Sequence, residues 1–169
     1  REIRVPLSQL PMRMAVAVTR ALRAHGVMSD VKWPNDIMLS DRKCGGMLIV
    51  LQPHSVIFGV GINVSLRDDE LPVPTATSLH LNGYDVERES LIAAITANVH
   101  SVVTSREPVR QEYAQICSTI DRDVDVSLIS GDKLSGKAVG LSDDGALIVL
   151  ANGQSHIVAV GDVVHVRPQ

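Results

Sequence analysis

The chain has 169 residues, of which 45% are hydrophobic and only 2% aromatic, and its formal net charge is −3 at pH 7. This length suits one ordinary domain, or one medium-sized and one small domain. The weakly acidic charge offers no basic surface for duplex nucleic acid, and the lack of aromatic residues argues against a surface that stacks single-stranded bases. No apolar run approaches the ~20 residues that cross a membrane. We therefore expect a soluble protein with neither nucleic-acid nor membrane partners.

The cysteine content gives a further indication. The two cysteines, Cys44 and Cys117, make neither a disulfide framework nor a metal cluster, and the six histidines show no metal-ligand spacing. A reduced, cytoplasmic setting fits. Lys43 could lower the pKa of the neighbouring Cys44 thiol, although a small packed side chain is the simpler interpretation.

The first half of the chain predicts one helix followed by strands. Apolar residues recur at helical spacing after Leu10-Pro11, and Gly26 is a stop signal. The next apolar segments have the length and composition of strands, and Ser40-Asp41-Arg42 predicts the turn of a hairpin. We expect these strands at residues 31–33, 37–39, 46–51 and 56–64.

Two more helices are predicted after a polar, proline-rich loop at residues 67–85. They occupy residues 88–105 and 109–117. The apolar face of the first is expected to consist of Leu91, Ile92, Ile95, Val99 and Val102.

The composition changes near Asp121. From there to Arg167, short apolar segments alternate with turn signals about every ten residues, and Asn152-Gly153 is the strongest hairpin signal among them. This spacing predicts a small antiparallel barrel or sandwich. We therefore expect an α+β protein with a first domain at residues 1–120, built on a mixed or antiparallel sheet with helices on one face, and a small β-barrel domain at residues 121–169.

Three short motifs lie on the predicted strands and their connections: Lys32-Trp33-Pro34-Asn35-Asp36, Arg42-Lys43-Cys44-Gly45-Gly46 and Gly59-Val60-Gly61-Ile62-Asn63. Together they supply a carboxylate, an amine, paired glycines and amides, and loops on a rigid sheet are where binding groups tend to be placed. The three motifs, in this order and with similar spacing, closely resemble those of the biotin–protein ligases (biotin–acetyl-CoA-carboxylase ligases).

The resemblance implies both a fold and a reaction. The fold is a class II synthetase-like catalytic domain, N-terminally incomplete here, with a C-terminal barrel of the Src-homology-3 type. In the implied reaction the carboxylate of biotin attacks the α-phosphate of ATP, which gives biotinyl-adenylate and pyrophosphate. The ε-amine of a lysine on the biotin carboxyl carrier domain of a carboxylase then displaces AMP.

The resemblance also suggests catalytic residues. Lys43 matches the lysine of the second motif, and its compact positive charge suits a phosphate that gains charge in the transition state. Asp36 is the other candidate. It could hold Mg²⁺ on the phosphates or orient the incoming lysine amine, and the sequence leaves both roles open.

The remaining candidates are assigned to substrate binding. Glycine weakens a strand unless something approaches the backbone closely, so the glycines are assigned to the biotin side, with a bulge or a crowded strand crossing as the alternative. Asn63 resembles the asparagine of the family that contacts the nucleotide, and Trp33 is expected to shape the floor of the pocket. The predicted substrate-binding residues are Gly45, Gly46, Gly59, Gly61, Asn63, Trp33 and Asn35.

The chain also departs from the family pattern. A Ser-Thr-Asn element, a glutamine and a Gly-Arg-Gly-Arg-type loop that precede these motifs in the family are not found here, and the first residue is Arg1 rather than Met. We expect a fragment whose activity alone is in doubt and whose incomplete sheet could pair with a second copy. Two alternatives stay open: a lipoate–protein ligase, and a non-catalytic module that binds a carrier domain.

Overall fold

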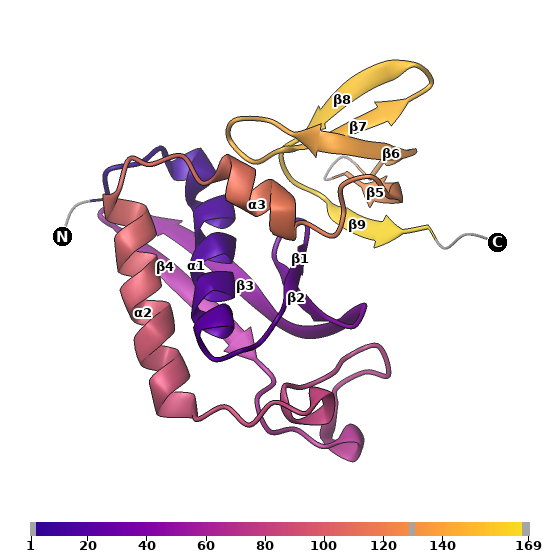
Figure 1. The fold of residues 1–169 in the computed structure, drawn as a ribbon. Coiled ribbons are helices and arrows are strands. Elements are labelled where there is room, and N and C mark those ends of the chain that lie inside the picture. The colour runs from indigo at the N-terminus through magenta and orange to yellow at the C-terminus, as the bar shows by residue number, and fades with distance from the viewer. Residues whose placement is uncertain (1–2, 129–130, 167–169) are drawn as a thin grey trace.

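The computed structural model describes residues 3–128 and 131–166, which form two antiparallel sheets and three α-helices (Figure 1). The expected α+β fold class is confirmed. The helices are α1 (Leu10–Ala24), α2 (Arg88–Thr104) and α3 (Arg110–Ile116), and single 3₁₀ turns lie at Leu7–Gln9, Asp68–Glu70 and His80–Asn82. The strands are β1 (Asp30–Lys32), β2 (Asp36–Leu39), β3 (Arg42–Gln52), β4 (Ser55–Ile62), β5 (Asp123–Ser127), β6 (Lys133–Leu141), β7 (Leu147–Ala151), β8 (Gln154–Val158) and β9 (Asp162–His165).

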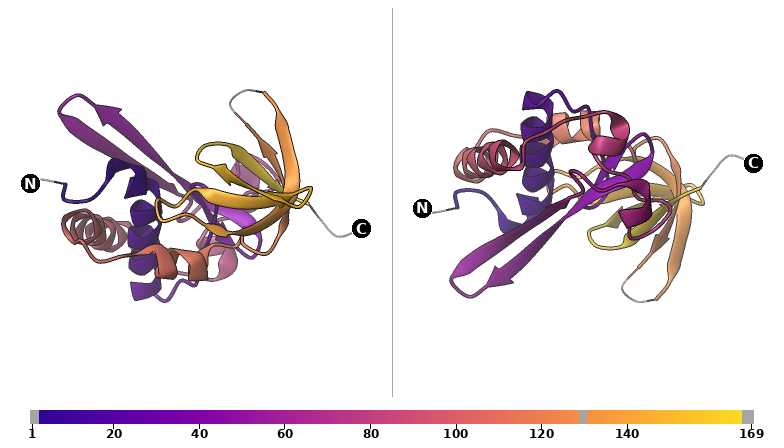
Figure 2. Two further views of the ribbon diagram at one scale, coloured as in Figure 1. Left: turned by 90° about the horizontal axis from the view of Figure 1, so that it is seen from above. Right: turned by 90° about the horizontal axis from the view of Figure 1, so that it is seen from below.

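Helix α1 lies between α2 and the first sheet (Figures 1 and 2). Eleven of its fifteen residues are buried, because neighbours cover it on several sides. Its start at Leu10, with a proline in the first turn, agrees with the sequence. It ends at Ala24, just before the predicted stop signal Gly26, which adopts φ +77° and donates its N–H to the Arg23 carbonyl.

Helix α2 corrects one expectation. Leu91 and Val102 are buried, and Ile95 and Val99 pack partly against the core. Ile92, however, is 64% exposed, so its assignment to the same face was wrong. Positions 91, 95, 99 and 102 follow the three- and four-residue steps of a helical stripe, whereas residue 92 is rotated by about 100° from residue 91.

The first sheet has the strand order β1-β2-β3-β4. Strands β2 and β3 form the predicted hairpin, and both residues of its two-residue turn, Ser40 and Asp41, have positive φ. The last turn of the β3–β4 hairpin extends beyond the helices (Figure 2). The helices lie on one face of this sheet, as predicted, and within residues 3–128 and 131–166 no helix covers the other face (Figure 2).

The second sheet has the order β8-β7-β6-β5-β9 and comes entirely from the C-terminal part (Figure 1). Asn152 and Gly153 form the β7–β8 turn with φ of 50° and 76°, as expected from the hairpin signal. Buried residues of both sheets belong to one continuous apolar cluster. The two sheets therefore pack against a shared core rather than being joined only by a flexible linker. Within residues 3–128 and 131–166, no helix has the length and apolar character needed to cross a bilayer.

Candidate functional site

Lys43 and Asp36 form an ion pair at the beginning of the β2–β3 hairpin. The Lys43 Nζ lies 2.5 Å from Asp36 Oδ1, and the two side chains are 50% and 22% exposed. The pairing register explains how they meet. Asp36 lies opposite Gly46 and Ile37 opposite Gly45, but Met38 lies opposite Lys43, so Cys44 is an extra residue in the ladder.

This bulge decides which way Lys43 points. In a regular strand, residues three apart face opposite sides of the sheet. The extra residue at Cys44 brings Lys43 to the face that carries Gly46, and consecutive burial of Cys44 and Gly45 marks the break in alternation. The amine and carboxylate that the sequence predicted are thereby brought together.

The ion pair lies in an open groove of about 510 Å³ on the first sheet. Six of the nine predicted site residues line it: Asn35, Asp36, Lys43, Gly46, Gly59 and Gly61. The other three lining residues, Met47, Leu48 and Val60, were not predicted. Leu48 could have been found from the sequence, because strand alternation places it on the same face as Gly46.

The four glycines divide into two kinds. A Cβ at Gly45 would collide with the Gly61 carbonyl oxygen, so the crowded strand crossing explains this glycine. A Cβ at Gly61 would meet nothing within 4 Å, and one at Gly46 would meet only the ion pair, 3.7 Å from Lys43 Nζ and from Asp36 Oδ1. At Gly59 the nearest atom would be Leu48 Cβ, at an ordinary 3.6 Å. Packing therefore requires glycine at 45 only, and the other three leave the groove floor open.

The two predicted asparagines make bonds within the protein. The Asn35 side chain donates to the Met47 carbonyl at 2.7 Å, and its own carbonyl accepts the Met47 N–H at 2.9 Å. Asn63 donates from Nδ2 to the Thr77 carbonyl at 2.9 Å. Its backbone continues the β3–β4 pairing by donating to the Cys44 carbonyl. Asn35 thus fixes the edge of the groove, whereas Asn63 holds the loop at residues 75–79 beyond the groove lining.

Trp33 does not line this groove. It is 3% exposed and its two N–H groups both bond outside the first sheet. The backbone N–H donates to Thr119 Oγ1 and the indole Nε1 to the Gly145 carbonyl, each at 3.0 Å. Trp33 instead lines a second cavity of about 740 Å³ between α1, β3 and the C-terminal sheet.

The larger cavity is the weaker candidate for the chemistry. Its described lining is mainly apolar, and Tyr113 and Asp144 are its only titratable side chains. The smaller groove contains the paired amine and carboxylate. Charge, rather than volume, therefore identifies the candidate site.

The structure excludes the less favoured alternative for Cys44, a thiol activated by Lys43. Cys44 is buried, and burial raises the pKa of its thiol to about 11, opposed in part by hydrogen bonding with the Asn63 backbone. Burial disfavours the thiolate because the charge would lose its hydration. The adjacent Lys43 side chain points into the groove, away from the buried sulfur. The simpler interpretation, a small packed side chain, is confirmed.

Two family models match the chain in order along the sequence. Residues 4–66 match the biotin/lipoate A/B protein ligase family, and residues 119–166 match the biotin protein ligase C terminal domain. The first match contains all three motifs, and the second contains every strand of the C-terminal sheet.

Individual relatives agree with these models. The chain is 30% identical over 156 residues to the bifunctional ligase/repressor BirA of Bacillus spizizenii, covering 83% of this chain and 48% of the relative. It is 31% identical over 142 residues to the biotin--[acetyl-CoA-carboxylase] ligase of Mycobacterium tuberculosis, covering 81% of this chain and 53% of the relative. The chain thus spans about half the length of the curated relatives it matches.

Solved structures share the fold. The apo biotin protein ligase of Aquifex aeolicus aligns with a TM-score of 0.84 at 23% identity, over 95% of this chain and 76% of that chain. The same enzyme in complex with biotin and ATP aligns with a TM-score of 0.81 at 24% identity, over 96% of this chain and 72% of that chain. The two family models, the relatives and the fold agree with one another. The chain belongs to the biotin protein ligase family.

Proposed function

We propose that this chain carries the catalytic region of a biotin–protein ligase, which activates biotin with ATP and transfers it to a lysine of a carrier domain. The observation that carries this proposal is the Lys43–Asp36 pair at one end of a groove whose floor has no side chain at Gly46, Gly59 and Gly61. Such a groove offers a cation next to exposed backbone, which suits an anionic, flat ligand.

The first step joins two anions. A carboxylate oxygen of biotin attacks the α-phosphorus of ATP, the bond to the pyrophosphate oxygen breaks, and biotinyl-adenylate forms. Negative charge gathers on the phosphate oxygens as this happens, so a fixed cation lowers the barrier. Lys43 is the residue that provides it, and its half-exposed ammonium is accessible from the groove.

Asp36 is assigned to orienting Lys43. Its carboxylate already accepts a bond from the Lys43 ammonium, which reduces the rotamer freedom of the lysine before substrate arrives. In the second step an acceptor lysine amine attacks the carbonyl carbon of biotinyl-adenylate, loses a proton and releases AMP. Asp36, at the rim of the groove, is also available to accept a hydrogen bond from that amine.

Magnesium would need oxygen ligands at the groove. The groove has a single carboxylate, Asp36, and its Oδ1 already binds Lys43. Among the described residues, no three or more His, Cys, Asp or Glu side chains gather into a metal site. The described groove residues therefore build no Mg²⁺ site of their own, whereas an ion held mainly by ATP phosphates would need only one or two carboxylates. The predicted Asp36–Mg²⁺ contact stays a prediction.

The acceptor is proposed to be the biotin carboxyl carrier domain of a carboxylase, as the name of the Mycobacterium tuberculosis relative suggests for that protein. We also propose the domain division at residue 120, since the chain passes from α3 to the second sheet between residues 116 and 123. Pairing of two copies through the first sheet remains a prediction, which light scattering over a concentration series would test.

Biotin is favoured over lipoate because the C-terminal part matches a biotin-specific model, whereas the first match covers both families. The test is ATP–pyrophosphate exchange by the full-length gene product with biotin or lipoate as the acid. Exchange driven by biotin supports the proposal. Exchange driven by lipoate alone would favour a lipoate ligase, and no exchange with either acid, together with binding to a carrier domain, would favour a non-catalytic module.

A further inference from the structure

The C-terminal part of the chain holds Trp33 at two points. The Trp33 backbone N–H donates to the Thr119 hydroxyl, and its indole N–H donates to the Gly145 carbonyl, each at 3.0 Å. Trp33 is 3% exposed and Thr119 is completely buried. The bond to Thr119 is buried and the bond to Gly145 is partly buried. A backbone donor left without its acceptor at Thr119 would lose a hydrogen bond that solvent replaces poorly.

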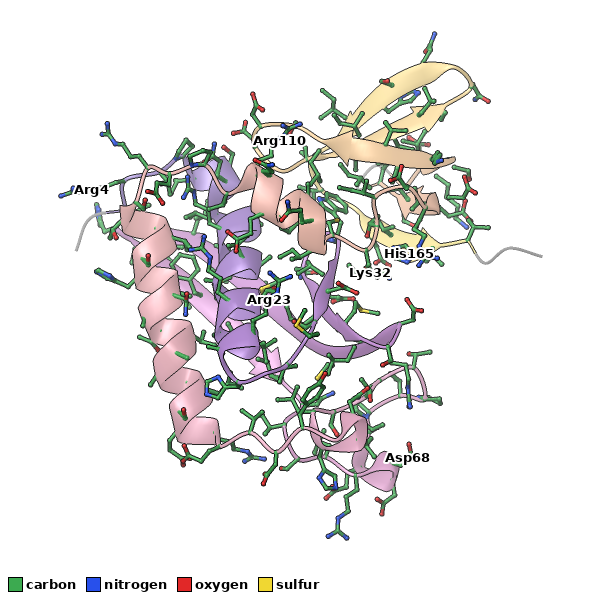
Figure 3. The ribbon with its side chains drawn as sticks, in the orientation of Figure 1. Arg4, Arg23, Lys32, Asp68, Arg110 and His165 are labelled. Carbon is green, nitrogen blue, oxygen red and sulfur yellow. The ribbon has the colours of Figure 1, made fainter. Side chains whose placement is uncertain are left out.

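Thr119 is itself fixed by its surroundings. Its hydroxyl also forms a 3.0 Å hydrogen bond with Nε2 of His165, on the last strand of the C-terminal sheet. The preceding residue, Ser118, donates its backbone N–H to the Val31 carbonyl at 2.9 Å. Residues 118 and 119 therefore extend along the free edge of β1 and connect it to β9. Figure 3 shows Lys32 of β1 close to His165 of β9 at this junction.

Gly145 belongs to a turn that is anchored on both sides. Its N–H donates to the Ser142 carbonyl at 3.0 Å, which closes the β6–β7 turn. On the other side the turn packs on α1, where a Cβ at Gly145 would approach Met12 Cβ to 3.1 Å. The carbonyl that receives the indole N–H is therefore held in place by α1 as well as by the C-terminal sheet.

Trp33 lies three residues before Asp36. The intervening Asn35 is fixed to Met47 of β3 through two hydrogen bonds, of 2.7 and 2.9 Å. The segment that delivers Asp36 to Lys43 is thus held from the C-terminal part at one end and from β3 at the other. A displacement of Trp33 would be passed along this short segment to the carboxylate.

We propose that Thr119 and Gly145 are positioning residues for the Asp36–Lys43 pair, acting through Trp33 so that the C-terminal part of the chain sets the geometry of the groove. The expected effect on catalysis rests on the proposed function. The expected effect on the geometry of the Asp36–Lys43 pair does not depend on it. A hydroxyl and a carbonyl 26 residues apart receive the two N–H groups of one residue, and that residue begins the segment that carries Asp36.

The structural test uses the single tryptophan of the chain, which gives one indole N–H signal in NMR spectra. Thr119→Val removes the hydroxyl at similar volume, and Thr119→Ser restores it. Ser118→Ala is the matched control, because the Val31 carbonyl that accepts from the Ser118 hydroxyl keeps its bond from the Ser118 N–H. The signals to follow are the Trp33 indole, the Asp36 carboxyl carbon and the Lys43 ammonium.

We expect Thr119→Val to shift the Asp36 and Lys43 signals, Thr119→Ser to return them toward the parent, and Ser118→Ala to leave them in place. Unchanged Asp36 and Lys43 signals in a folded Thr119→Val variant would overturn the proposal. If that variant does not fold, Trp33→Phe decides in its place. It removes the indole donor together with part of the ring volume and keeps the backbone N–H bond to Thr119. Unchanged Asp36 and Lys43 signals would then count equally against the proposal.

The catalytic test is ATP–pyrophosphate exchange by the full-length gene product. Misplacement of catalytic groups lowers turnover more than binding, so we expect Thr119→Val to lower kcat roughly 10- to 100-fold with the KM for biotin nearly unchanged. A rise in KM alone, or an equal loss in Ser118→Ala, would contradict a positioning role. If the parent itself shows no exchange, the proposed function fails, and the NMR comparison still decides the positioning.

Discussion

Lys43 and Asp36 belong to neighbouring strands, and they meet because Cys44 is an extra residue in the β2–β3 ladder. The bulge turns the Lys43 side chain to the face of the sheet that carries Gly46 and the groove. Bulges often re-aim a side chain beside an active site. Here the bulge brings the side chains of two residues, seven positions apart in the sequence, together as an ion pair.

Replacing Lys43 by alanine should reduce adenylate formation far more than biotin binding. The ammonium acts on charge that is largest in the transition state, so the loss should appear in kcat. Removal of one preorganised donor typically costs about 2.7–4 kcal/mol, or roughly 10²- to 10³-fold in kcat. The measurement is biotin-dependent ATP–pyrophosphate exchange by the full-length gene product, with calorimetry for biotin affinity.

The control for Lys43 is its neighbour Arg42, which bonds the Pro74 carbonyl outside the groove. Arg42→Ala removes a positive charge from the same strand and should keep turnover close to that of the parent. Near-parental turnover in Lys43→Ala would show that the lysine is only a surface residue.

Alanine substitutions at three glycines should separate folding from binding. Gly45→Ala should lower the melting temperature strongly, because its Cβ would collide with the Gly61 carbonyl oxygen. Gly61→Ala has open space around its Cβ, and Gly46→Ala only the flexible ion pair, so both should fold normally. Each places a methyl group in the groove and should weaken binding of a biotinyl-adenylate analogue, as calorimetry would measure. Unchanged affinity in both would place the ligand elsewhere.

The Cys44 thiol should be inert in the folded protein. Burial raises its pKa to about 11, so little thiolate exists at pH 8. Cys117 is also buried, and burial raises the pKa of its thiol too. A chromogenic disulfide reagent should therefore react slowly at both positions until denaturant is added. Rapid labelling of Cys44 without denaturant would contradict the buried placement of the bulge.

Arg13→Met should destabilise the fold more than Arg20→Met, although both residues lie on α1. The Arg13 guanidinium is buried and donates to the carbonyls of Val102, Ser105 and Glu107, at and just beyond the end of α2. Leaving these carbonyls without donors should cost about 2–3 kcal/mol. Arg20 forms a part-exposed pair with Glu112, which should contribute no more than about 1 kcal/mol.

Denaturant unfolding of the two arginine variants at neutral pH would measure this difference. Equal losses would mean that the Arg13 bonds to these three carbonyls contribute little to stability. A common decrease in the slope of the free energy against denaturant would point instead to a less compact native state.

His165 should make stability depend on pH near neutrality. Its pKa lies below the usual 6.5, first because of burial and then because of the positive charges of Lys32 and Arg122, with Asp41 opposing them. As the pH falls below about 6.5 the unfolded state takes up a proton that the folded state does not, so this contribution to stability decreases. It is fully present above pH 6.5 and falls until the pH reaches the lowered folded pKa.

The melting temperature of the parent and of His165→Gln, followed from pH 7.5 to 5.5, would measure this effect. The variant should lose less stability over that range, because glutamine can still bond the Thr119 hydroxyl but does not titrate. Equal losses in both proteins would assign the pH dependence to other groups.

Local sequence patterns were sufficient to predict where the helices, strands and hairpin turns lie. The helix over residues 10–24, the turn at Ser40-Asp41 and the Asn152-Gly153 hairpin depend on residue spacing and turn preferences, which act between near neighbours. The three motifs likewise identified the family, because they are properties of the chain itself. The predicted boundary near Asp121 rests on a change in composition, after which strand and turn signals recur about every ten residues.

Tertiary structure decided how those residues are used. Period-two alternation would place Lys43 away from Gly46, and only the bulge at Cys44, formed by pairing with β2, reverses this. Gly45 and Gly61 are chemically identical in the sequence, yet one is crowded by a neighbouring strand and the other is open. Trp33 joins the two sheets through acceptors more than 80 residues away. Contacts across such separations depend on how the elements pack in three dimensions, and one-dimensional patterns do not record that packing.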